Sequence, residues 1–227
     1  RSWPEAVEVA RDAGCDSLIV CEGGAAVADI AQGAILESWK IPDQTGLDIL
    51  EALKKWDVGI MLFAGDELVI NSRCNEAFRN YPSGEVFRSK RIVCDELPAF
   101  LRERGLPVNK IFIIGDPASF PELRAGLEQW REDIYITSSG RDNLEILANG
   151  VDKGTGIAAL ARRLGISMEE VIGIGDSDND RGMLTAVGMP VVMGNAAPEI
   201  KAMGRYITDT NEKAGVAKAI RHFLEQG

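Results

Sequence analysis

Residues Val171–Asp180, VIGIGDSDND, carry the strongest indication of the fold. A short apolar run punctuated by glycine is typical of a strand buried in a parallel sheet. Three carboxylates follow it at once, Asp176, Asp178 and Asp180, at the place where open α/β sheets bind their ligands. Carboxylates this close together repel one another unless a cation lies among them, and an all-oxygen site favours Mg²⁺ or Ca²⁺. The stretch therefore predicts a hard-metal site on a doubly wound sheet.

Other interpretations of this acidic segment explain less of it. An EF-hand loop beginning at Asp176 would need glycine and glutamate where Arg181 and Val187 stand. A dinucleotide-binding turn would need a third glycine where Asp178 stands. A helix N-terminus capped by Asp178, with Asp180 favourable to the helix dipole, accounts for those two residues. It does not account for Asp176 at the end of the strand.

From Val151 onward the pattern alternates between helices and strands. The segment Thr155–Leu164 carries apolar residues spaced i, i+3, i+4 and i+7, and Gly165 follows it, which predicts an amphipathic helix. The remaining predicted elements are strands over 171–175, 189–193 and 206–208 and helices over 178–187, 198–203 and 216–224. The first 41 residues predict a helix over 2–13 that Ser2 can cap, a strand over 16–21, and a hairpin or short strands over 25–39.

Residues 43–150 follow a different order, α-β-β-α-β-α-β-β, with weak patterning over 71–92. The predicted elements lie at 43–56, 58–63, 67–70, 95–104, 110–114, 117–130, 134–138 and 144–148. Such an order describes a self-contained α+β layer. We therefore predict an α/β fold, with a parallel-sheet core made of residues 1–41 and 151–227 and an inserted domain at 42–150.

Composition narrows the class of protein. The chain has 227 residues, a formal net charge of −10 and 26% charged residues, which argues against a general binder of nucleic acid or of membrane surfaces. Its four cysteines show no zinc-ligand spacing and fit a reducing, cytoplasmic setting. No stretch is long and apolar enough to predict a membrane span.

Lys153 is the second candidate functional residue. It lies in the sequence GVDKGT, residues 150–155, just before a predicted helix, and the spacing is not that of a Walker loop. By itself it could be a solvated loop lysine. Beside an acidic metal site, a lysine near a helix N-terminus can neutralise a phosphate oxygen.

Three stretches, at 150–166, 171–208 and 211–220, together resemble the C-terminal half of haloacid dehalogenase-like (HAD) phosphatases. The resemblance is greatest to the Cof-type subgroup, which has a class IIB cap. It implies a Rossmann-like core with an inserted α+β cap and a Mg²⁺ cofactor. It also implies that Lys153 neutralises the substrate phosphate and takes part in catalysis, and that Asp176 ligates the metal. Asp180 would support the metal or its waters and assist catalysis, and Asn179 would hydrogen-bond near the phosphate.

The same family uses an Asp-x-Asp pair near its N-terminus, whose first aspartate attacks phosphorus. Arg1 resembles the arginine of a family motif that follows this pair. We therefore expect the pair to lie upstream of Arg1 and the natural protein to be longer. The family's Asn-Gly turn corresponds to Glu22-Gly23 here. The implied function is Mg²⁺-dependent hydrolysis of a small phosphorylated metabolite, such as a sugar phosphate, through an aspartyl-phosphate. The alternatives are a sucrose-phosphate or mannosyl-phosphoglycerate phosphatase-like enzyme and a non-catalytic metal- and phosphate-binding relative.

Overall fold

The computed structural model describes residues 1–79 and 85–225. The chain divides into two compact units, Arg1–Val151 and Asp152–Gly227, named unit 1 and unit 2 here. Within the described residues, no helix combines the length and the apolar character that crossing a bilayer requires. The assignment of residues 1–41 to one domain with 151–227 stays a prediction.

Unit 1 contains a six-stranded sheet in the order β6-β5-β4-β7-β9-β8. Its neighbouring strands are antiparallel except for the parallel pair β5 and β6. The strands are β4 (Gly59–Ala64), β5 (Glu67–Ile70), β6 (Arg91–Val93), β7 (Val108–Ile114), β8 (Ile134–Thr137) and β9 (Asn143–Ala148). Both hairpins predicted from the sequence, β4–β5 and β8–β9, are confirmed.

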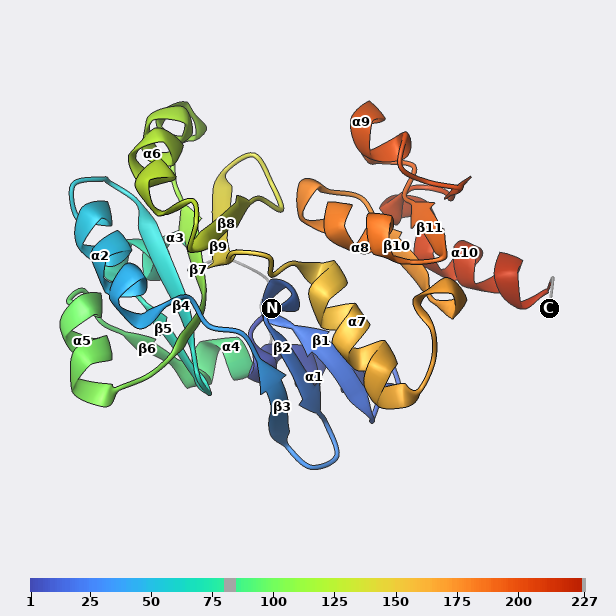
Figure 1. Cartoon of the computed structure of the whole chain (residues 1–227), viewed down its shortest axis with the longest axis horizontal. Helices are drawn as coiled ribbons and strands as arrows, with labels where there is room; N and C mark the ends of the chain where they lie inside the picture. The colour runs from blue at the N-terminus through green and yellow to red at the C-terminus, as the bar shows by residue number, and fades with distance from the viewer. Residues whose placement is uncertain (80–84, 226–227) are drawn as a thin grey trace. The chain divides into compact units, whose positions relative to one another are not determined.

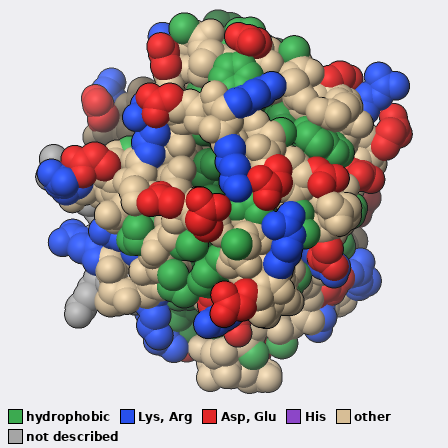
Figure 2. Space-filling view, turned by 90° about the vertical axis from the view of Figure 1, so that its left-hand side faces the viewer, with side chains coloured by type: hydrophobic (Ala, Val, Ile, Leu, Met, Phe, Trp, Pro, Cys, Tyr) green, Lys and Arg blue, Asp and Glu red, His purple; other side chains and the backbone are tan. Residues whose placement is uncertain are grey.

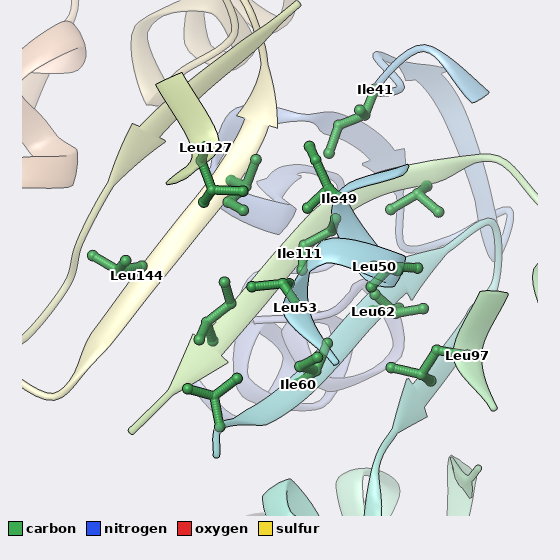
Figure 3. Close-up of a cluster of buried hydrophobic side chains, with 14 of the residues drawn as sticks. Ile41, Ile49, Leu50, Leu53, Ile60, Leu62, Leu97, Ile111, Leu127 and Leu144 are labelled. Atoms are coloured by element: carbon green, nitrogen blue, oxygen red, sulfur yellow. The ribbon is translucent and has the colours of Figure 1, made fainter. Parts of the chain in front are cut away.

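One face of this sheet is covered by α2 (Asp43–Leu53), α5 (Leu97–Arg104) and α6 (Phe120–Leu127) (Figure 1). Alternation along β4 points Ile60 and Leu62 into this layer and Met61 and Phe63 to the opposite face. Figure 3 shows the resulting core, with Ile49 and its neighbours on α2 lying over Ile60, Leu62 and Ile111. The solvent side of these helices carries both signs of charge interspersed (Figure 2), which is typical of a solvated face.

The opposite face packs against α3 (Ser72–Ala77) and α4 (Glu85–Lys90). Cys74 and Phe87 from these helices join Met61 and Phe63 in a second buried cluster. These short helices and the start of β6 lie in the described part of residues 71–92, where the residue pattern is weak.

The N-terminal segment of unit 1 forms α1 (Trp3–Asp12) and a second, antiparallel sheet. Its strands are β1 (Leu18–Cys21), β2 (Ala26–Asp29) and β3 (Ala34–Ser38), in that order. The predicted hairpin is confirmed. Ser2 occupies the capping position of α1, but its side chain makes no capping hydrogen bond, so that detail of the prediction is wrong.

Unit 2 is built on a parallel sheet, β10 (Ile172–Gly175), β11 (Met189–Val192) and β12 (Tyr206–Ile207). The accompanying helices are α7 (Lys153–Leu164), α8 (Arg181–Ala186), α9 (Pro198–Lys201) and α10 (Gly215–Leu224). Strict β/α alternation and parallel pairing are thus confirmed. The predicted helix 178–187 is a 3₁₀ turn, Asp178–Asp180, followed by α8, and Ser177 rather than Asp178 holds the capping position.

Candidate functional site

The candidate site lies in unit 2, where two neighbouring parallel strands end. Asp176 directly follows β10, and Asn195 lies three residues after β11. The side-chain amide of Asn195 donates to Oδ2 of Asp176 at 2.8 Å, and the Ser177 hydroxyl donates to Oδ1 of Asp176 at 3.0 Å. Sequence reasoning missed Asn195, although a polar residue just past the next parallel strand is a usable signal.

Asp180 organises the loop that carries Asp176. Its Oδ2 accepts hydrogen bonds from the backbone N–H groups of Asp176 at 2.9 Å and Ser177 at 3.0 Å. The residue is 5% exposed, so these bonds are shielded from water. Gly175 makes this fold of the chain possible, because a Cβ there would lie 2.6 Å from Cβ of Asp180.

Lys153 is the first residue of α7, and the other oxygen of Asp180 binds it. Its ammonium lies 2.6 Å from Oδ1 of Asp180 and 2.9 Å from Oδ1 of Asn179. The helix begins here because Asp152 accepts the N–H of Thr155 at 3.0 Å in a capping box. A lysine ammonium has three donors, so these two bonds leave one for an anion.

The three carboxylates of the acidic segment have separate partners. Asp178 accepts a hydrogen bond from Nε of Arg181 at 2.6 Å, whereas Asp180 holds Lys153 and the loop. In the described parts of the chain, no three His, Cys, Asp or Glu side chains converge on a point that could hold a metal ion. The structure therefore brings together four of the predicted site residues, Asp176, Asn179, Asp180 and Lys153.

The donor chemistry around Asp176 fits Mg²⁺. This ion prefers oxygen ligands and is usually held by one or two carboxylates together with waters and substrate phosphates. Asp176 is half-buried at the sheet edge, and each of its oxygens accepts one side-chain hydrogen bond, which orients the carboxylate. Direct ligation by Asp180 would compete with its bond to Lys153, so its hydrogen bonds favour a supporting role.

Comparison with known proteins adds relatives of both the sequence and the fold. The chain is 44% identical over 100 residues to the 5-amino-6-(5-phospho-D-ribitylamino)uracil phosphatase YcsE of Bacillus subtilis, a match covering 43% of this chain and 40% of that protein. A haloacid dehalogenase-like hydrolase from B. subtilis superposes with a TM-score of 0.84 at 24% identity, covering 98% of this chain and 85% of the other. The subclass IIB sugar phosphatase BT4131 superposes with a TM-score of 0.76 at 18% identity, covering 96% and 79%.

The chain thus spans less than half the length of the first curated relatives that it matches. The family of haloacid dehalogenase-like hydrolases matches residues 1–220. That range includes both the α+β layer of unit 1 and the Lys153–Asp180 cluster of unit 2. As the motifs of unit 2 predicted, the chain belongs to the haloacid dehalogenase-like hydrolase family.

Proposed function

We propose that this protein is a Mg²⁺-dependent phosphatase that hydrolyses a small phosphate monoester. The observation that carries the proposal is the contact between Lys153 and Asp180 beside Asp176. At the carboxyl edge of the parallel sheet, Asp180 fixes the Lys153 ammonium through one oxygen and the backbone of Asp176 through the other. This combination supplies what a phosphoryl group needs, a fixed positive charge and a metal-ligating oxygen.

Each residue of the cluster has a distinct proposed task. Lys153 donates its remaining N–H to a phosphate oxygen and stabilises charge that moves onto it in the transition state. Asp176 holds Mg²⁺, which when bound supplies Lewis-acid polarisation of the phosphoryl group. Asn179 positions the lysine and hydrogen-bonds near the phosphate, and Asp180 fixes both the lysine and the Asp176 loop. The attacking carboxylate, the aspartate of the family's Asp-x-Asp pair, is proposed to precede Arg1 and to form an aspartyl-phosphate.

The substrate is proposed to be a small phosphorylated metabolite. The relative YcsE is a phosphatase of such a compound, 5-amino-6-(5-phospho-D-ribitylamino)uracil. We assign residues 42–150 the role of a cap that selects the organic part of the ester, in keeping with the break in β/α rhythm there. The four cysteines are free, which supports a reducing, cytoplasmic location.

The test measures hydrolysis of p-nitrophenyl phosphate and of a panel of phosphate esters by the intact protein, with Mg²⁺ and with EDTA. Lys153→Ala is expected to lower kcat/KM at least about 100-fold, the order found for the loss of one preorganised donor. Lys201→Ala is the matched control, because Lys201 lies on α9 outside the cluster. Turnover that survives EDTA, or that Lys153→Ala changes less than twofold, would refute the proposal. Absence of turnover by the intact protein would favour a non-catalytic binding protein.

A further inference from the structure

The carboxyl edge of the parallel sheet in unit 2 carries a series of hydrogen bonds that crosses all three strands. It begins at Asp176 after β10, passes through Asn195 after β11, and ends at Asn211 after β12. The Asn195 amide donates to Oδ2 of Asp176 at 2.8 Å. The backbone N–H of Asn211 donates to Oδ1 of Asn195 at 3.1 Å. The carboxylate proposed to hold Mg²⁺ is therefore connected to a loop that lies much further along the chain.

The two partners of Asn195 allow its amide only one orientation. An ionised carboxylate offers only acceptors, whereas a backbone N–H is only a donor. The side-chain nitrogen must therefore face Asp176 and the side-chain oxygen must face Asn211. Exchanging them would set an oxygen against the carboxylate and an NH₂ group against the N–H. An exposed asparagine held at one end could still rotate, but Asn195 is held at both ends.

The backbone that leads to Asn195 is fixed from both sides. The N–H of Met193 donates to the carbonyl of Gly175 at 3.0 Å, which ties it to the end of β10. The N–H of Gly194 donates to the carbonyl of Asp209 at 3.1 Å, which ties it to the loop after β12. A Cβ at position 194 would lie 3.1 Å from the carbonyl carbon of Asp209. Glycine therefore allows the loop after β12 to lie this close to the loop after β11.

Asn195 orients Asp176 without neutralising its charge. The neighbouring carboxylate of Asp180 lies 2.6 Å from a cation, the Lys153 ammonium. The two side chains that donate to Asp176 are instead uncharged, a hydroxyl from Ser177 and the amide of Asn195. Asp176 thus keeps its negative charge for a cation while both of its oxygens are held in place.

A carboxylate held in this way suits one divalent ion better than another. Mg²⁺ demands near-ideal octahedral geometry, whereas Ca²⁺ accepts a variable number of oxygen ligands in flexible arrangements. A fixed carboxylate therefore favours Mg²⁺, because Ca²⁺ can adjust its coordination to a ligand that moves. Selectivity between the two ions depends on the rigidity of the ligands as well as on their number.

We infer that Asn195 is a positioning residue that makes this site selective for Mg²⁺ over Ca²⁺, and that the N–H of Asn211 sets its orientation. The inference rests on the proposed function, because it takes Asp176 as the metal ligand. Asn195 and Asn211 are both exposed, and substitutions of exposed residues usually change stability little. A role in folding alone would therefore leave the affinities for the two ions in their wild-type ratio.

The first test titrates Mg²⁺ and, separately, Ca²⁺ into the intact protein and into Asn195→Ala by isothermal titration calorimetry. The substitution should weaken Mg²⁺ binding about tenfold, the lower end of the cost of losing a group that orients a metal ligand. It should weaken Ca²⁺ binding less than about threefold. Thermal unfolding without metal verifies the fold. Wild-type Mg²⁺ affinity in the variant, or equal weakening for both ions, would overturn the inference.

The second test removes a single backbone N–H. Asn211→Pro deletes the donor that orients Asn195, and Asn211→Ala is the matched control, because alanine keeps that N–H. Proline fits here, since Asn211 is the first residue of a 3₁₀ turn and Thr210 before it is extended, with φ −73° and ψ 164°. Asn211→Pro should weaken Mg²⁺ binding about three- to tenfold, the contribution of one neutral hydrogen bond. Asn211→Ala should change it less than about twofold, and equal effects of the two substitutions would overturn the inference.

Asp176→Asn separates a failure of this inference from a failure of the proposed function. Mg²⁺ binding that is lost in Asp176→Asn but unchanged in Asn195→Ala would refute the inference alone. The expected losses of Mg²⁺ affinity without any turnover of phosphate esters by the wild type would support the inference and refute the proposed function alone. Wild-type Mg²⁺ affinity in Asp176→Asn would refute Asp176 as the ligand and the inference with it.

Discussion

The carboxylate of Asp152 occupies the space that a side chain at position 182 would need, so that only glycine fits there. The same carboxylate caps α7 by accepting the N–H of Thr155. A Cβ at Gly154 would likewise lie 2.6 Å from the carbonyl oxygen of Gly182. The starts of α7 and α8 therefore meet backbone to backbone, and this close approach brings Lys153 within 2.6 Å of Asp180.

The first prediction concerns that approach. Gly182→Ala should destabilise the protein by about 1–3 kcal/mol, the usual cost of overpacking, and should also lower phosphatase kcat because α7 must shift with Lys153. Thermal unfolding and turnover of a phosphate ester measure the two effects. Gly126→Ala is the control, since a Cβ on Gly126 in α6 would meet nothing within 4 Å. That variant should be neutral or slightly more stable, and equal losses in both variants would contradict the packing argument.

The second prediction separates the carboxylates of the acidic loop. Asp176→Asn should weaken Mg²⁺ binding by at least about tenfold, because it removes the negative charge at the sheet edge. Asp178→Asn should change the affinity less than threefold, since the partner of Asp178 is Arg181. Calorimetric titration of Mg²⁺ into the three proteins measures this. Equal affinity in the wild type and Asp176→Asn would refute Asp176 as the ligand.

The third prediction concerns the buried ion pair of unit 1, in which Nζ of Lys110 lies 2.6 Å from Oε2 of Glu145. Burial would raise the pKa of Glu145, but the charge and hydrogen bond of the Lys110 ammonium, together with a hydrogen bond from Ser139, outweigh burial, and the pKa falls to about 2. The ionised pair therefore stabilises the fold fully above the ordinary glutamate pKa of about 4.3, and this contribution is lost as pH falls from there through about 2.

The measurement is urea unfolding of the wild type and Glu145→Gln at several pH values. The difference in the free energy of unfolding should be constant between pH 7 and pH 5 and should shrink toward pH 2. Glu132→Gln is the control, because Glu132 is 85% exposed in its pair with Arg131, and it should show little difference at any pH. A gap between wild type and Glu145→Gln that stays constant down to pH 2 would show that the pKa of Glu145 is the same in the folded and unfolded protein.

The fourth prediction ranks the cysteines by reactivity. Burial raises the pKa of Cys21 and of Cys74 to about 12, whereas Cys15 is exposed and Cys94 half-buried. Because the thiolate is the reactive form, a disulfide reagent at pH 8 should modify Cys15 first and Cys94 more slowly. The two buried cysteines, Cys21 and Cys74, should react only after unfolding. Cys15→Ser should remove the fast phase. Modification of Cys74 in the native protein at the rate of Cys15 would mean that α3 opens readily.

Elements that depend on adjacent residues could be predicted from the residue pattern. The sequence VIGIGD at residues 171–176 is enough to predict β10 and the acidic loop at its end. Strand burial and chain reversal depend on adjacent residues, so a local pattern reveals them. Helical periodicity similarly predicts α7. The segment 71–92 gave no such signal, because α3, α4 and β6 are 6, 6 and 3 residues long, too short to show a period.

The partners of the polar side chains depend on how distant segments pack together. The 3₁₀ turn at the end of β10 directs Asp180 toward Lys153, 27 residues away in the chain, and leaves Asp178 to Arg181. Asn195 reaches Asp176 because β10 and β11 pair in parallel. The pair of Lys110 and Glu145 depends on the register of β7 and β9. Spacing along a chain cannot reveal such contacts, because strand pairing and helix packing bring together residues that no local pattern connects.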